Sequence, residues 1–306
     1  MTIQLMPEGP LDVLHTLARY RIWGEDPASR LGDGVFRRVL LLDGKLHGYA
    51  LRWSGPPDEA RLTITVPHSR SERVWEAVCA EVRRVLFLEA DLAGFYRMAK
   101  GDGILQGLIA PFYGMRPTLG ATPFEMLVGA IAAQQVNLPF AMTTRARLVR
   151  RFGCPVQVEG ETVYAFPTPE AAARATVRDL RRMQFSTRKA EYIIGLARRV
   201  SRSELVFERV TSLSNEQVIA ELTRVRGIGR WTAEWFLARV LGRGDVCPAG
   251  DLGVRKCFAH FYAGGRALSE RAIRRRAVAW GQYQNLAVHY LLAGHRRLRG
   301  RAGDDA

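Results

Sequence analysis

Two segments of the chain carry residue types and spacings that could do chemistry. The first, residues 222–236, reads LTRVRGIGRWTAEWF and interrupts a helical pattern with Gly227 and Gly229 before a second helix begins. Glycine lets the backbone approach a partner closely, and the free N–H groups at a helix N-terminus favour an anion. The segment therefore predicts a phosphate-binding turn. A tight connection between two helices would use the same glycines, and the pattern alone leaves both interpretations open.

The second segment, residues 245–258, reads DVCPAGDLGVRKCF and places Asp251 directly before another helical run. An aspartate in this position is typical of a helix N-cap, where its carboxylate accepts backbone N–H groups. The same carboxylate could stabilise positive charge that develops in a transition state. The residues alone do not separate the structural role from the catalytic one.

The composition favours a polyanionic partner. The chain has 306 residues, with 45 lysines and arginines against 30 aspartates and glutamates, and a net charge of +15. A charge of this sign and size is typical of proteins that bind nucleic acid. Nearly all of the excess is arginine, which a GC-rich genome would also produce, but the positive charge remains under either explanation.

The cysteines and the hydropathy pattern exclude several other classes. Cys79, Cys154, Cys247 and Cys257 lie far apart, which excludes a standard zinc finger and a clustered iron–sulfur site. No apolar run approaches the roughly 20 residues that span a bilayer, and the first residues lack the pattern of a signal peptide. We therefore expect a cytoplasmic protein without membrane contact.

The N-terminal part, residues 1–90, reads as a small α+β domain. Two strand-like runs flank Asp43 and Gly44, a dipeptide suited to a hairpin turn. Residues 61–67 continue the strand pattern, and residues 74–85 place valines at helical spacing. An antiparallel sheet covered by one helix follows from this order.

The remainder, residues 91–306, shows short helices with clear N-terminal signals. Capping boxes are expected at Thr122 and at Ser214, each with a Glu or Gln three residues later. No strand pattern stands out between these helices, so the sequence predicts an all-α bundle. The charged and glycine-containing end, residues 295–306, reads as disordered.

The two opening segments together resemble a known family. Leu-x-x-Val-x-Gly-Ile-Gly-x-Trp-Thr-Ala followed by Pro-Ala-x-Asp-Leu-Gly is similar to the signature of helix–hairpin–helix (HhH-GPD) DNA glycosylases, and within them to the bacterial 3-methyladenine DNA glycosylase II type. The resemblance covers about residues 90–295. It implies an α+β N-terminal sheet domain followed by an all-α HhH glycosylase bundle with two helical subdomains, residues 118–238 and residues 91–117 plus 239–306.

The resemblance also implies roles for individual residues. Asp251 matches the catalytic aspartate, and Trp231, Trp235 and Leu292 match positions of the base pocket. Positions that match DNA contacts are Gln134, Gln135, Arg226, Gly227, Ile228, Gly229, Arg230 and Thr232. The backbone carbonyls of Thr223, Val225 and Gly227 match positions that hold a monovalent cation, Na⁺ or K⁺. No cofactor is implied for catalysis.

The chemistry of this family fits these residue types. The damaged nucleotide is flipped out of the duplex, and a carboxylate stabilises the oxocarbenium-like transition state of N-glycosidic cleavage. Related enzymes that also cut the strand carry a lysine two residues after the second hairpin glycine, where this chain has Trp231. The expected function is therefore a monofunctional DNA glycosylase that excises alkylated bases such as 3-methyladenine and 7-methylguanine. The alternatives are a bifunctional glycosylase/lyase for oxidised purines and a non-catalytic HhH DNA-binding protein.

The resemblance has two departures that bear on substrate range. Gln135 is polar where the family has an aliphatic side chain, and Leu292 stands where the family has a tryptophan. Trp280, Tyr283, His289 and Tyr290 offer further rings, although their helical spacing also suits the core. The expected partner is double-stranded DNA with damaged bases, bound by a monomer in the bacterial cytoplasm at the nucleoid.

Overall fold

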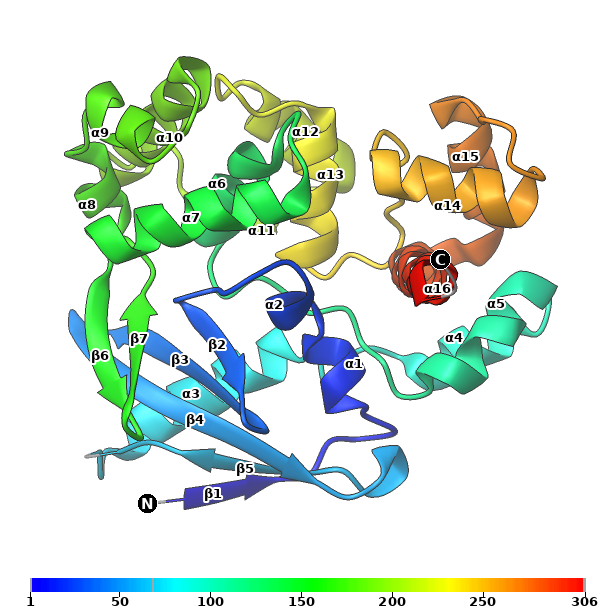
Figure 1. The fold of residues 1–306 in the computed structure, drawn as a ribbon, viewed down its shortest axis with the longest axis horizontal. Helices are drawn as coiled ribbons and strands as arrows, with labels where there is room; N and C mark the ends of the chain where they lie inside the picture. Colours follow the sequence, from blue (N-terminus) through cyan, green and yellow to red (C-terminus); the bar gives the residue numbers. More distant parts are fainter. Residues whose placement is uncertain (1, 68, 305–306) are drawn as a thin grey trace.

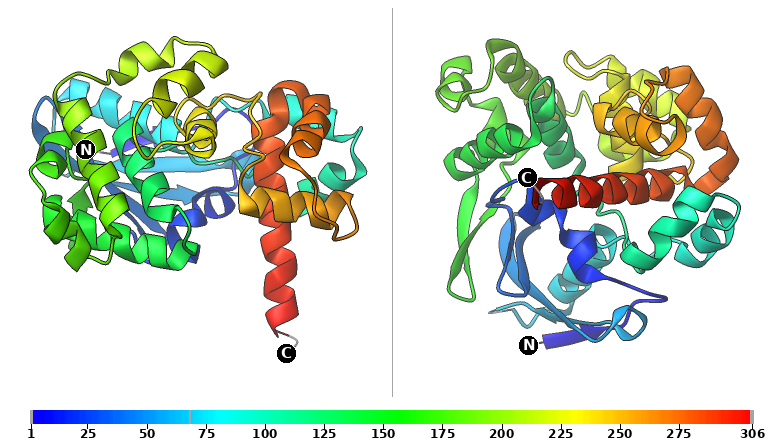
Figure 2. Two further views of the ribbon diagram at one scale, coloured as in Figure 1. Left: turned by 90° about the horizontal axis from the view of Figure 1, so that it is seen from above. Right: turned by 45° about the vertical axis from the view of Figure 1, so that its right-hand side comes forward.

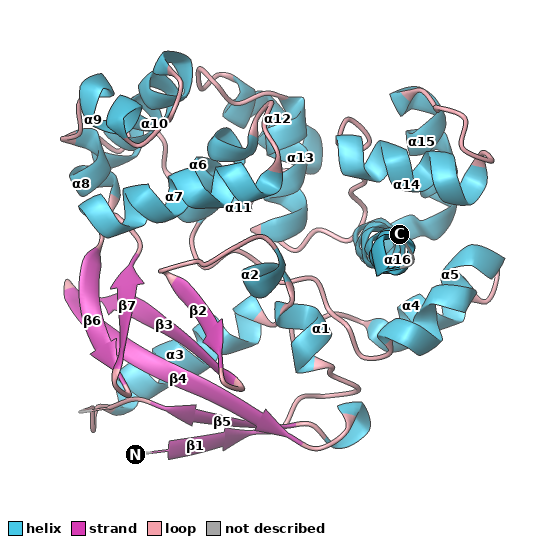
Figure 3. Ribbon diagram, viewed as in Figure 1, coloured by secondary structure: helices cyan, strands magenta, loops and turns pink. Residues whose placement is uncertain are grey.

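A computed structural model describes residues 2–67 and 69–304 of the chain. An N-terminal antiparallel sheet lies beside a larger helical region (Figures 1 and 3), as the predicted fold class requires. The strands of this sheet, in spatial order, are β1 (Thr2–Leu5), β5 (Arg61–Thr65), β4 (Lys45–Ser54), β3 (Val35–Leu42) and β2 (Ser29–Gly32). The helices of the same part are α1 (Val13–Leu17), α2 (Arg19–Ile22), the 3₁₀ turn η1 (Pro57–Glu59) and α3 (Glu72–Val85).

The local signals of the sequence explain this sheet. Asp43 and Gly44 both have positive φ, 50° and 76°, which is the backbone of a two-residue hairpin between β3 and β4. On α3 the valines that were expected on one face are buried, and they pack with Leu62 and Ile64 of β5 in one apolar cluster. Alternating burial along β5 and helical burial along α3 therefore build a common core.

The helical region follows from residue 92. Its helices are α4 (Leu92–Ala99), α5 (Gly103–Ile109), η2 (Ala110–Phe112), α6 (Pro123–Ala133), α7 (Leu138–Phe152), α8 (Pro169–Ala173), α9 (Val177–Arg182), α10 (Thr187–Ser201), α11 (Phe207–Thr211), α12 (Asn215–Thr223), α13 (Arg230–Arg239), α14 (Leu252–Tyr262), α15 (Glu270–Ala277), η3 (Val278–Tyr283) and α16 (Gln284–Asp304). Their buried residues form one large apolar cluster that runs from Leu92 to Ala293. Within the described residues, no helix is both long and apolar enough to cross a membrane. The proposed division at residue 90, and that of the helical part into two subdomains, stays a prediction.

One expectation about the helical region is wrong. Between α7 and α8 the chain forms a hairpin of two strands, β6 (Cys154–Val158) and β7 (Glu161–Ala165). Val158 and Val163 of this hairpin pack with Val39 and Ala50 of β3 and β4, so the hairpin lies on the N-terminal sheet. A side chain at Gly48 would overlap Val158. Five-residue strands whose apolar side chains meet a different part of the chain give too weak a local pattern to be recognised.

The end of the chain also differs from its expected state. Residues 295–304, expected to be disordered, continue α16 as a helix, which extends beyond its neighbours in Figure 2. The first half of α16 is buried against α14 and α5, and this packing provides the nucleus from which the helix continues. Residues 305 and 306, which belong to the same expectation, lie outside the described residues.

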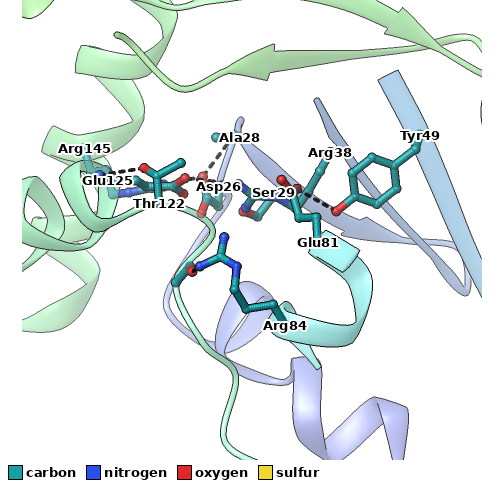
Figure 4. A network of polar contacts seen from close by, with 11 residues as sticks. Asp26, Ala28, Ser29, Arg38, Tyr49, Glu81, Arg84, Thr122, Glu125 and Arg145 are labelled. Carbon is teal, nitrogen blue, oxygen red and sulfur yellow. Dashed lines mark hydrogen bonds and ion pairs between the residues drawn. The ribbon is translucent and has the colours of Figure 1, made fainter. Parts of the chain in front are cut away.

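The sheet and the helical region are joined by a buried network of charged groups (Figure 4). Arg38 of β3 binds Glu81 of α3 and donates to Glu125 of α6 at 3.0 Å. Glu125 also accepts from Arg145 of α7 at 2.7 Å, and Arg145 binds Asp26. All five side chains are buried. The predicted capping box at Thr122 is therefore only half formed: Thr122 accepts the Glu125 N–H, but the Glu125 carboxylate faces the arginines.

Candidate active site

The glycine turn lies between α12 and α13, as predicted. Gly227 has φ 93°, and a side chain there would overlap the ring of Tyr192, so this position requires glycine. Gly229 is the N-cap of α13 with an ordinary φ of −99°, and a Cβ added there would meet no atom within 4 Å. No side chain caps α13. Its first N–H groups, with the positive end of the helix dipole, are therefore open to an anion.

The chain after α13 turns back and places Asp251, the N-cap of α14, beside α13. Its Oδ1 accepts the Val254 N–H at 3.0 Å and so caps α14, which confirms the N-cap interpretation. Its Oδ2 accepts the indole N–H of Trp231 at 2.8 Å and that of Trp235 at 3.2 Å. Trp231 and Trp235 are four residues apart on α13 and therefore share one face. One oxygen of the carboxylate therefore caps α14, while the other accepts both indole N–H groups.

Leu292 joins this group from α16. A Cβ built on Gly253, the second residue of α14, would lie 3.0 Å from Asp251 Oδ1 and 3.3 Å from Leu292 Cδ2. Leu292 therefore lies beside the start of α14, next to the aspartate. The four residues assigned to catalysis and the base pocket come together in the structure from three separate helices.

Two further side chains, Arg239 and His289, contact the Trp235 ring. The Arg239 guanidinium lies over the Trp235 ring, 5.3 Å from its centroid, and His289 meets the same ring edge-on at 5.8 Å. His289 Nδ1 lies 2.8 Å from the Asn285 carbonyl, so Nδ1 carries the proton and Nε2 accepts from Arg239 at 2.9 Å. Burial lowers the pKa of His289 well below its usual value, and Arg239 lowers it further. His289 was among the sequence candidates, whereas Arg239 was missed, although it follows Trp235 by one helical turn.

The other rings named with His289 belong to the core. Trp280 donates to Asp102 at 3.2 Å, and the Tyr290 hydroxyl donates to the Met115 carbonyl at 3.1 Å. Tyr283 donates to Asp91 at 2.8 Å, beside the start of α4. These three residues therefore hold helices together and do not line the group around Asp251.

The arginines beside the glycine turn are paired with glutamates. Arg226 lies 3.1 Å from Glu191, and Arg230 lies 3.0 Å from Glu234 and 3.6 Å from Glu216. The Arg226 side chain is 76% exposed, and exposed pairs of this kind contribute little to stability. A phosphate can therefore replace the glutamate at Arg226. Thr232 is buried and its hydroxyl lacks a hydrogen-bond partner within the described residues, while Ile228 packs in the core.

The loop after α6 is attached to the glycine turn. Gln134 ends α6, and its side-chain amide donates to the Gly227 carbonyl at 2.8 Å. Gln135 follows with φ 55° and is exposed. Val136 and Leu138 beside it are also exposed, which the sequence reading did not single out. The structure therefore places residues 134–138 next to the glycine turn, with polar and apolar side chains exposed.

The carbonyls assigned to a monovalent cation lie at the end of α12 and in the turn. Gly227 O accepts from Gln134, and Val225 O accepts the Ile228 N–H at 3.0 Å, which leaves each a second lone pair. Thr223 is the last residue of α12, where the helix dipole favours positive charge. The oxygen donors therefore fit Na⁺ or K⁺. Among the described residues, no group of three His, Cys, Asp or Glu side chains could hold another metal ion.

The comparison with known protein families agrees with this geometry. Residues 128–282, which include the glycine turn and Asp251, match the model of the HhH-GPD superfamily base excision DNA repair proteins. The chain belongs to this superfamily. It is 32% identical to a DNA-3-methyladenine glycosylase of Bacillus subtilis over 73% of this chain and 74% of that protein. It is 26% identical to DNA-3-methyladenine glycosylase 2 of Escherichia coli over 85% and 86% of the two chains.

Solved structures extend the likeness to the whole fold. A 3-methyladenine DNA glycosylase from Archaeoglobus fulgidus is 31% identical, with a TM-score of 0.85 over 96% of this chain and 98% of that one. The 8-oxoguanine glycosylase/lyase of Clostridium acetobutylicum bound to DNA, at 17% identity and a TM-score of 0.76 over 98% of each chain, shares the HhH-GPD fold alone. The sheet and bundle architecture therefore occurs with both kinds of glycosylase, and the site residues must distinguish them.

Proposed function

We propose that this HhH-GPD protein is a monofunctional DNA glycosylase that excises alkylated bases, chiefly 3-methyladenine and 7-methylguanine, and leaves an abasic site. The observation that carries the proposal is the Asp251 carboxylate, held by the indole N–H groups of Trp231 and Trp235. The relatives of similar length from B. subtilis, E. coli and A. fulgidus are named as 3-methyladenine glycosylases, which supports the substrate class.

The geometry accounts for hydrolysis without a general acid. A flipped nucleotide would place its sugar near Asp251, whose negative charge stabilises the oxocarbenium-like transition state while water attacks the sugar carbon. The hydrogen-bond donors to the Asp251 carboxylate are the neutral N–H groups of Val254, Trp231 and Trp235, so its charge is available for this purpose. An N-alkylated purine is already cationic and leaves unaided. The tryptophan faces attract such a base by cation–π interaction, about 0.5–2 kcal/mol.

The same geometry disfavours the lyase alternative. A Schiff base requires an amine at the sugar, and Trp231 occupies the position where lysine stands in the bifunctional enzymes. Lys256, on α14, is exposed. A non-catalytic DNA-binding role would not account for the two indole donors to the half-buried Asp251 carboxylate.

The proposal extends to the way DNA is held. The uncapped N-terminus of α13 binds one DNA phosphate, and the carbonyls of Thr223, Val225 and Gly227 would hold Na⁺ or K⁺, whose positive charge would favour the phosphate. Replacing K⁺ by a large organic cation at constant ionic strength should weaken DNA binding if the cation is bound there. We further propose a monomer that acts in the bacterial cytoplasm on chromosomal DNA; sedimentation at micromolar concentration would test the monomer.

The decisive experiment is base release from defined duplexes. The protein is incubated with one duplex context that carries 3-methyladenine, 7-methylguanine, ethenoadenine or 8-oxoguanine, and the released base is measured. We expect fast release of the methylated purines, intact strands until alkali is added, and no adduct trapped by borohydride. Faster release of 8-oxoguanine than of 3-methyladenine would contradict the alkylation proposal, and an efficiently trapped adduct would contradict the monofunctional one.

A further inference from the structure

Glu234 on α13 is a buried carboxylate that the cleavage chemistry does not use. It lies on the helix between Trp231 and Trp235 and is only 2% exposed. Its Oε1 accepts from Arg230 Nε at 3.0 Å and from Arg274 Nη1 of α15. Its Oε2 is buried and, among the described residues, has no hydrogen-bond partner. One oxygen therefore holds two guanidinium groups from two different helices.

Compared with apolar residues of similar size, this arrangement contributes little to stability. Removing a carboxylate from water is costly, and the unpaired Oε2 leaves part of that cost without compensation. Apolar residues of similar size would fill such a space at least as favourably. The charged group is better explained by the geometry it imposes on Arg274 and Arg230.

Arg274 transmits this geometry to the segment that carries the aspartate. Its Nη1 donates to the Cys247 carbonyl at 3.4 Å, and its Nη2 donates to Glu270 at 3.3 Å. The carbonyl belongs to a compact turn in which the Ala249 N–H donates to Cys247 O at 2.7 Å and the Asp251 N–H to Pro248 O at 2.9 Å. Fixing Cys247 therefore fixes the backbone from which the Asp251 side chain projects.

We propose that Glu234 is a positioning residue for Asp251. Through Arg274 it holds the turn 247–251 against α13, so that the carboxylate meets the indole N–H groups of the same helix. Glu234 also binds Arg230, the first residue of α13 after the glycine turn. One carboxylate therefore fixes the relative positions of the phosphate-binding end of α13, its two tryptophans and the turn 247–251. The inference rests on the proposed glycosylase function for its effect on rate, but its effect on geometry can be measured without activity.

The first readout is the indole N–H spectrum of uniformly ¹⁵N-labelled protein. Resonances of Trp231 and Trp235 are assigned by single Trp→Phe substitutions, and Trp280, whose indole binds Asp102, serves as an internal reference. We expect Glu234→Gln and Arg274→Gln each to shift the resonances of Trp231 and Trp235 and to leave that of Trp280 in place. Arg274→Lys keeps the charge but loses the fork of donors, and its shifts should be smaller.

The second readout is single-turnover release of 3-methyladenine. Glu234→Gln and Arg274→Gln should lower the rate by about 10- to 100-fold, since small displacements of a catalytic group have effects of this size. Affinity for abasic-site DNA should be retained. Glu216→Gln is the matched control because it removes the other carboxylate of Arg230 without contact to Arg274, and it should change neither readout.

Several outcomes would overturn the proposal. The proposal is contradicted if the folded variants release base at the wild-type rate and their Trp231 and Trp235 resonances do not shift. It is also contradicted if all indole resonances shift equally, because this indicates a general loosening of the structure. If Glu234→Gln does not fold, Arg274→Gln decides, since the Arg274 side chain is 31% exposed. If the wild-type protein releases no base, the glycosylase proposal fails, while the resonances still decide the positioning role.

Discussion

Trp231 Nε1 lies 2.8 Å from Asp251 Oδ2, although the two residues are twenty positions apart along the chain. The indole donates its only polar hydrogen to the carboxylate, which leaves its π-face for the proposed base pocket. One residue can therefore orient the aspartate and contact a flipped base. Under the proposed function, this hydrogen bond fixes the wall of the base pocket and the catalytic charge relative to each other.

Asp251→Asn should abolish most excision without disrupting the fold. Asparagine is as good an N-cap as aspartate, so α14 should retain its start, whereas the negative charge is lost. We expect single-turnover release to fall by about 100- to 1,000-fold, the usual cost of removing one electrostatic stabiliser. Gel-shift affinity for lesion DNA should persist. An Asn variant of wild-type activity, once deamidation is excluded by mass spectrometry, would remove Asp251 from the mechanism.

Trp231→Phe and Trp235→Phe separate the two functions of the indoles. Phenylalanine keeps an aromatic face but removes the N–H donor to Asp251. We expect the release rate to fall by about 10- to 100-fold, as for other groups that orient a catalytic residue. The effect should be larger at Trp231, whose hydrogen bond is the shorter one. Equal rates for wild type and both variants would show that the indole donors do not matter.

Gly227→Val and Gly229→Val should differ in their effect on thermal stability. Valine at 227 would overlap Tyr192 and adopt an unfavourable φ, so thermal stability and DNA affinity should both fall. A Cβ at 229 meets no protein atom within 4 Å and φ is negative there, so stability should fall less than in the 227 variant while affinity for any DNA sequence falls. For the wild type, log affinity should decline with log salt by about 0.9 per phosphate neutralised. Unchanged affinity in the 229 variant would argue against a phosphate at this helix end.

His289 should make the free energy of unfolding depend on pH. Its pKa is lowered in the folded protein, so the unfolded chain takes up a proton near the ordinary value of 6.5 and the folded one does not. The stability contributed by the neutral histidine is thus present above 6.5 and is lost as pH falls below it, by at most about 1.4 kcal/mol per pH unit. Urea unfolding of His289→Gln, which can still accept from Arg239, should show a smaller loss between pH 7 and pH 5. The exposed His260→Gln serves as the control, and equal losses in both variants would contradict the assignment.

The sequence predicted those features whose physical cause is local. The hairpin at Asp43-Gly44, the N-cap at Asp251 and the glycine turn are set by a few adjacent residues, and each is confirmed. The strands β6 and β7 were missed because their apolar side chains are explained only by a sheet that lies more than a hundred residues earlier in the chain. Glu234 and Arg239 were missed for a similar reason. A charged residue on a helix reads as solvated until its partner from another element is known.

The base pocket was only partly predictable from the sequence. Resemblance to a family nominated Asp251, Trp231, Trp235 and Leu292, and the structure brings them together. Their roles in catalysis and binding stay predictions that the variants above test. Spacing alone could not have shown that both indoles share one carboxylate oxygen, because this depends on the path of the turn 247–251.

The charged network of Figure 4 has a consequence for synthesis on the ribosome. Arg38 leaves the ribosome long before its partner Glu125, 87 residues later, and Asp26 precedes Arg145 by 119 residues. Until α6 and α7 emerge, burying this edge of the sheet would leave Asp26 without its ion-pair partner Arg145 and Arg38 with Glu81 alone, which is unfavourable. The nascent sheet must therefore stay open at this edge and closes only when the helices arrive. A chain cut between the two parts would leave Asp26 without Arg145 and Arg38 with one carboxylate instead of two, so the sheet and the bundle are expected to fold, and to be degraded, as one unit.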